Sequence, residues 1–144
     1  MIYFLDASAL VKRYIREPGS AAVRSLLRRR RTLAVSAVSA VEVPSALWRR
    51  ARLGDLSTEL ARRFADQLPF DLEAMDVVEV RAPVLELAAQ LVEQHPLRAD
   101  DAIQLASALR LAREARLALT FACSDGPLRD AATAEGIKAL WVGE

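Results

Sequence analysis

The chain has 144 residues, of which 53% are hydrophobic, so it can bury a core and we expect one domain covering residues 1–144. No apolar run approaches the ~18 residues that span a bilayer, so we expect no membrane anchor. The net charge is only +1, and the single Cys123 and single His95 exclude both an intramolecular disulfide and a zinc site made of protein ligands alone.

Apolar runs and helical periodicity alternate along the chain. The first run, at 2–5, has no basic segment before it and is followed at once by Asp6, so we expect a strand rather than a secretory signal and predict a cytoplasmic protein. In chain order, the pattern then predicts helices at 8–15 and 20–31, a strand at 33–36, helices at 39–53 and 58–68, a strand at 75–80, helices at 84–94 and 99–116, a strand at 117–122, and a last helix before a strand at 139–142. Strands that alternate with helices of this length indicate an α/β protein with a parallel sheet covered on both faces.

Acidic side chains follow three of the predicted strands, close to the points where those strands end. Asp6 directly follows the first strand, Glu42 follows the second by a few residues, and Asp125 follows the fourth. Two adjacent acids, Asp100 and Asp101, begin the helix at 99–116. Because the ligand sites of open parallel sheets lie beyond the carboxyl ends of the strands, we expect these acids to gather at one edge of the sheet.

Helical spacing separates the two adjacent acids. Asp101 falls on the apolar face with Leu105 and Leu109, whereas Asp100 falls on the face of Gln104. We therefore expect Asp101 to point inward and Asp100 to point outward, and spacing is the only argument that distinguishes them.

Carboxylates that converge at the edge of a core repel one another and lose hydration, and a hard divalent cation such as Mg²⁺ or Mn²⁺ stabilises such an arrangement. The ion can lower the pKa of a water, polarise a phosphoryl oxygen and neutralise charge during an in-line displacement. The acids therefore favour a metal-dependent phosphodiester hydrolysis.

Each acid also has a purely structural explanation, which the sequence leaves open. Asp6 and Asp125 could cap the helices that follow them, and Ser39 with Glu42 fits a capping box. The acids at 100–101 could complement a helix dipole. Pro44 lies past the first turn of the helix predicted from residue 39, so we expect that helix to start late or to kink.

Four segments of the chain resemble those of a known family. The strand ending in DASALVK at 6–12, the S-x-x-E element at 39–42, the LRADDAIQLA segment at 97–106 and the SDGPL turn at 124–128 together look like a PIN domain. The small size resembles the VapC toxins of bacterial and archaeal toxin–antitoxin pairs. The resemblance runs essentially end to end. It implies an α/β/α sandwich with a parallel sheet of about five strands, a Mg²⁺ or Mn²⁺ site, endoribonuclease activity on RNA, a cognate antitoxin and a homodimer.

The resemblance also implies a role for each matching residue. Asp6, Asp101 and Asp125 would coordinate or position the metal. Glu42 would orient or deprotonate the attacking water, and Ser8 would hydrogen-bond one of the acids or a water of the metal.

Contact with RNA requires positive charge near the acids. Lys12, Arg13 and Arg16 follow the first motif and Arg98 precedes the third, so we expect phosphate contacts from them, with a solvated helix surface as the alternative. The basic run at 28–31 could also bind RNA, although cations at a helix C-terminus are favoured in any case.

Two other functions fit parts of the pattern. A PIN-like module that binds a partner without catalysis would be marked by the loss of several acids, and all four acidic positions are filled here. A phosphoacceptor domain would need an adjacent acidic pair near the first strand and a lysine just after the fifth, whereas Asp6 stands alone and Lys138 precedes the last strand.

Overall fold

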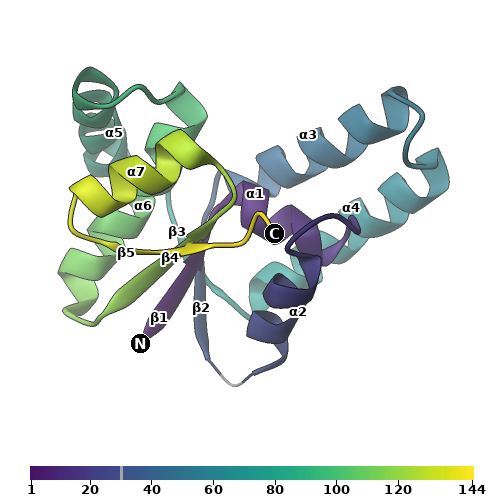
Figure 1. The fold of residues 1–144 in the computed structure, drawn as a ribbon, viewed down its shortest axis with the longest axis horizontal. Coiled ribbons are helices and arrows are strands. Elements are labelled where there is room, and N and C mark those ends of the chain that lie inside the picture. Colours follow the sequence, from purple (N-terminus) through teal and green to yellow (C-terminus); the bar gives the residue numbers. More distant parts are fainter. Residues whose placement is uncertain (30) are drawn as a thin grey trace.

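The computed structural model describes residues 1–29 and 31–144, and its centre is a five-stranded parallel sheet (Figure 1). The strands are β1 (Ile2–Leu5), β2 (Thr32–Ser36), β3 (Asp76–Val78), β4 (Leu119–Cys123) and β5 (Lys138–Trp141). Their order across the sheet is β3-β2-β1-β4-β5, so the first strand of the chain lies in the middle. The predicted α/β class and the five parallel strands are confirmed.

Helices cover both faces of this sheet (Figure 1). They are α1 (Ala7–Leu10), the 3₁₀ turn η1 (Val11–Arg13), α2 (Ser20–Arg28), α3 (Ser39–Arg52), α4 (Thr58–Glu73), α5 (Ala82–Gln94), α6 (Ala99–Ala115) and α7 (Gly126–Ala134). Helices α1 to α4 pack on one face and α5 to α7 on the other, as an α/β/α sandwich requires. Helices α3 and α4 form a pair that extends away from the sheet (Figure 1).

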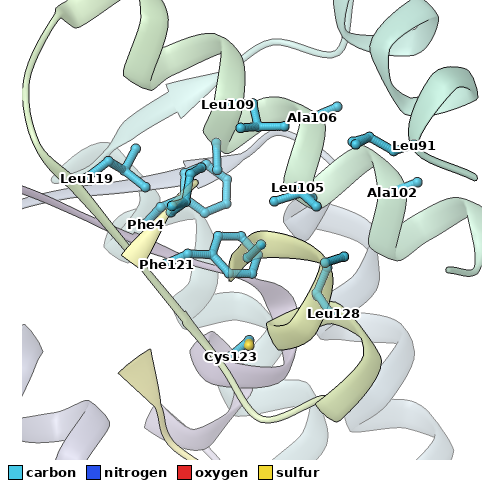
Figure 2. Close-up of a cluster of buried hydrophobic side chains, with 14 of the residues drawn as sticks. Phe4, Leu91, Ala102, Leu105, Ala106, Leu109, Leu119, Phe121, Cys123 and Leu128 are labelled. Carbon is cyan, nitrogen blue, oxygen red and sulfur yellow. The ribbon is translucent and has the colours of Figure 1, made fainter. Parts of the chain in front are cut away.

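The side chains of neighbouring β1 residues point alternately toward the two helical layers. Phe4 faces α5 to α7, where its ring stacks on Phe121 at a centroid distance of 5.6 Å, against Leu105 and Leu128 (Figure 2). Leu5 faces the other layer, where the cluster includes buried side chains from α1, α3 and α4. Because the sheet is covered on both sides, its strands are apolar throughout rather than alternating.

Most element boundaries match the prediction, and the differences have local causes. The helix predicted at 8–15 is shortened to α1 and η1, and the strand predicted at 75–80 keeps only Asp76–Val78 as β3. Helix α4 continues past residue 68 through Pro69, because Leu68 and Leu72 still pack on the core. Helix α2 ends at Arg28, and of the basic run at 28–31 one residue, Arg30, lies outside the described residues.

Helix α3 begins at Ser39 and includes Pro44, so the expected late start is wrong. The proline lacks one backbone donor, and the fully buried side chains of Val43 and Leu47 on the same helix offset this loss. Within residues 1–29 and 31–144, none of the helices combines the length and the apolar composition that a bilayer crossing requires.

Candidate active site

A pocket of about 270 Å³ lies at the carboxyl edge of the sheet, where β1 and β4 end between α1, α3 and α6. Since β2 pairs with one side of β1 and β4 with the other, this is the point at which the strand order reverses and where open parallel sheets bind ligands. We call it the acid pocket. Its lining includes Asp6, Ser8, Glu42, Arg49, Arg98, Asp100, Asp101 and Asp125.

Asp6 is the most deeply buried acid of the pocket, with 2% of its surface exposed. It caps α1 by accepting a hydrogen bond from the Ala9 backbone N–H at 2.9 Å, and the Ser8 hydroxyl donates to its two oxygens at 2.7 and 2.9 Å. Burial raises the pKa of Asp6 to about 7 against these hydrogen bonds, and the charges of Asp101 and Glu42 raise it further. Asp6 therefore does cap the helix that follows it, as the structural explanation expected, and this capping bond also holds its carboxylate at the acid pocket.

Ser8 links the ends of the two central strands. While its hydroxyl donates to Asp6, it accepts a hydrogen bond at 3.1 Å from the backbone N–H of Ser124, just after β4. The position of the Asp6 carboxylate thus depends on both strands.

Glu42 does not form the capping box that its spacing from Ser39 suggests. The residue that caps α3 is Val38, which makes no side-chain capping bond. Instead, the side-chain amide of Gln104 donates to the Ser39 hydroxyl at 2.9 Å and to Glu42 Oε1 at 3.3 Å, which holds Glu42 toward α6. Burial raises the pKa of Glu42 to about 7, and the charges of Asp100 and Asp101 add to this.

The two adjacent acids of α6, Asp100 and Asp101, differ in exposure as helical spacing predicts. The side chain of Asp101 is 12% exposed and that of Asp100 is 44% exposed. Burial raises the pKa of Asp101, and the charges of Asp100 and Asp125 raise it further. Arg98 Nε lies 3.3 Å from Asp101 Oδ2 and opposes this shift.

Asp125 completes the pocket from the end of β4. It caps α7 by accepting a hydrogen bond from the Leu128 backbone N–H at 2.9 Å, and it also lines the acid pocket. The capping explanation and the convergence at the sheet edge therefore both hold for this residue.

The acid pocket suits a divalent cation in charge and in ligand type. Its donors are carboxylate and hydroxyl oxygens, which Mg²⁺ and Mn²⁺ prefer, and the raised pKa values of Asp6, Glu42 and Asp101 reflect a burial of like charges that a cation would relieve. Among the described residues, no three acidic, histidine or cysteine side chains already stand at the spacing of a complete ligand set. An ion would therefore have to draw these carboxylates together.

Comparison with known proteins identifies the family. The family model of the PIN domain matches residues 3–121. The chain belongs to the PIN-domain family. A relative of this PIN domain, Ribonuclease VapC46 of Mycobacterium tuberculosis, is 36% identical over 137 residues, which cover 95% of this chain and 95% of the relative.

Two solved structures share the fold of this PIN domain at low sequence identity. VapC20 of Mycobacterium tuberculosis, described as a sarcin–ricin loop cleaving toxin, matches with a TM-score of 0.67 and 18% identity over 94% of this chain and 95% of its own. VapBC2 of Rickettsia felis, bound to a DNA fragment from its promoter, matches with a TM-score of 0.65 and 14% identity over 97% and 98%.

Of the four basic residues expected to contact phosphate, Arg98 lines the acid pocket of the PIN domain, and Lys12, Arg13 and Arg16 lie outside it. Lys12 is 4% exposed, and its ammonium donates to Glu17 Oε1 at 2.9 Å and to the Pro18 carbonyl at 2.7 Å. Arg13 donates to Asp71 of α4 at 2.7 Å. These internal ion pairs do not support Lys12 or Arg13 as phosphate contacts.

The PIN domain also places two residues at this site that the sequence analysis did not select. Arg49 lines the acid pocket two helical turns after Glu42, a spacing of seven residues that puts both on one face of α3. Gln104 holds Glu42 from one turn after Asp101 on α6. Helical spacing from the known acids was the signal that could have found them.

Proposed function

We propose that this PIN domain, residues 1–144, is a metal-dependent endoribonuclease that hydrolyses RNA phosphodiesters as the toxin of a toxin–antitoxin pair. The observation that carries the proposal is the convergence of Asp6, Glu42, Asp101 and Asp125 in one pocket at the centre of the sheet edge. The 36% identity to a ribonuclease over nearly the whole chain supports the same chemistry.

In this proposal, Asp6, Asp101 and Asp125 hold Mg²⁺ or Mn²⁺. When bound, such an ion lowers the pKa of a water and neutralises charge on the phosphoryl group. Ser8 keeps the Asp6 carboxylate in one orientation through its two hydrogen bonds and its own bond from Ser124.

Glu42 acts as the general base in this scheme. Burial raises the pKa of Glu42, so this carboxylate takes up a proton more readily than an exposed glutamate does. Gln104 donates to Oε1, so the other oxygen of Glu42 would receive the proton of the attacking water.

The partners follow from the family resemblance. We propose a cognate antitoxin that fills the acid pocket and docks on neighbouring apolar helices, a homodimer, and a cytoplasmic site of action. The exposed apolar side chain of Val41, beside Glu42 and at the rim of the acid pocket, supports a protein partner there.

The test is cleavage of total cellular RNA by the purified, partner-free protein in Mg²⁺ or Mn²⁺. Discrete products are expected from the wild type and from Asp66→Asn, which changes an exposed acid of α4. They should disappear in EDTA and in Asp6→Asn and Glu42→Gln. Products that persist in Asp6→Asn would contradict the assigned site, while an intact RNA pool with no effect of metal on stability would favour the non-catalytic binding module.

A further inference from the structure

A second hollow, which we call the flanking groove, continues from the acid pocket. Its volume is about 250 Å³, and it shares Ser8, Val11, Ala46 and Arg49 with the acid pocket. Beyond these, it runs along η1 and the end of β4 and is also lined by Ile15, Glu17, Arg50 and Ser124. A ligand at the acids can therefore extend into the groove without leaving the surface.

The face of α3 between Glu42 and Arg49 forms one wall of this continuous path. The residues between them on that face, Ser45 and Ala46, are small and leave room for a ligand. Seven residues of helix separate Glu42 from Arg49 by about 10 Å along the axis. A long arginine side chain can bridge much of that length toward the acids.

The cations around the path differ in their partners. Arg98 is paired with Asp101 and Asp100, and Arg50 lies 3.3 Å from Glu17 and 2.9 Å from Asp55. Within the described part of the chain, the exposed Arg49 makes no ion pair. Its charge is available to a ligand.

The one acid of the groove does not oppose an anion there. Glu17 lies 2.9 Å from Lys12 and 3.3 Å from Arg50, so its charge is compensated on both sides. The path from the acid pocket into the flanking groove therefore runs from negative charge at the acids to the uncompensated positive charge of Arg49, which fits a chain whose phosphates repeat along its length.

We propose that Arg49 and the flanking groove form a subsite for an RNA phosphate next to the bond that is cleaved in the acid pocket. This inference rests on the proposed nuclease function. Arg49 positions the substrate by one charged contact with a phosphate, which adds affinity and register without reading the base sequence.

The test measures binding of a short, randomised, fluorescein-labelled RNA in Mg²⁺ by anisotropy, on a Glu42→Gln background in every arm so that the RNA stays intact. Arg49→Gln is compared with Arg52→Gln, an exposed arginine on the same helix that lines neither hollow. Loss of one charged contact should weaken binding about tenfold. The slope of log K against log salt should become less steep by about 0.7, the value for one phosphate of a single strand.

Equal effects of Arg49→Gln and Arg52→Gln on the dissociation constant and on the salt slope would overturn the subsite. Cleavage by the protein with native Glu42 is scored separately. If that protein cleaves no RNA while Arg49→Gln still weakens binding more than Arg52→Gln, the nuclease proposal fails and the RNA-binding groove stands.

Discussion

Replacing Asp6 by asparagine is expected to change stability in opposite directions at low and high pH. The folded state raises the pKa of Asp6 from its ordinary value of 3.8 to about 7. Above that pH, ionising the buried carboxyl in the folded state costs about 4 kcal/mol more than in the unfolded chain. This cost is absent below pH 3.8, grows as the pH rises toward 7, and is complete above 7.

Asparagine carries no charge and escapes this cost. Its one oxygen can still accept from the Ala9 N–H and from Ser8, but its amide nitrogen replaces Oδ2, the second acceptor of the Ser8 hydroxyl, and sets an N–H donor against that hydroxyl, a loss of about 1 kcal/mol. Without metal, Asp6→Asn should therefore be more stable than the wild type by about 3 kcal/mol near pH 8. It should be less stable by about 1 kcal/mol below about pH 4.

Urea unfolding in EDTA, followed by far-ultraviolet circular dichroism across this pH range, measures both differences. The exposed Asp66→Asn variant should follow the wild type throughout. A destabilisation of Asp6→Asn by the same amount at both ends of the pH range would refute the reasoning. It would mean that burial does not disfavour the charged form of the Asp6 carboxyl.

The same variant tests the metal site. An ion that binds only the folded protein stabilises it by about 2.7 kcal/mol at a concentration one hundred times its dissociation constant. Mg²⁺ or Mn²⁺ should therefore stabilise the wild type and Asp66→Asn near neutral pH and above, and most of this gain should vanish in Asp6→Asn. An equal gain in Asp6→Asn would show that the ion binds elsewhere.

Two further substitutions test the packing around the site. Tyr14→Phe removes the buried hydroxyl that donates to Asp71 of α4, so it should lower the free energy of unfolding, measured in urea, by about 1 to 2 kcal/mol. The control is Tyr3→Phe, which should cost less because the Tyr3 hydroxyl has no protein partner among the described residues. Gly19→Ala would place a Cβ 1.8 Å from a carbonyl oxygen of the C-terminal segment and should destabilise the protein more than Gly54→Ala, measured by thermal unfolding. Both glycines have a positive φ, but Gly54 has open space around it, so equal losses would contradict the packing of that segment.

Much of the fold could be predicted because its elements have strong local signals. The apolar run of β1 and the repeating apolar face of α5 require little knowledge of their surroundings. The boundaries failed where packing between distant residues decides. Pro69 would end an isolated helix, and α4 continues because Leu72 finds a place on the core that no local pattern reveals.

The acids of the site could be predicted because their positions follow from topology. Asp6 and Asp125 come after strands that prove to be neighbours, so the rule for strand ends places them together. The basic residues could not be predicted in this way, because their partners decide their roles. Lys12 and Arg13 are near the first acid in sequence, but they form ion pairs with Glu17 and Asp71, away from the acid pocket.

The central position of β1 has a consequence for the order of events during synthesis. Its pairing with β2 is possible once residues through Ser36 are available, whereas β4, its other neighbour, ends at Cys123. Asp6 follows β1 and Asp125 follows β4, so Asp6 meets Asp125 only after the intervening helices have been translated. A nascent chain therefore carries an incomplete acid pocket until synthesis has passed Asp125.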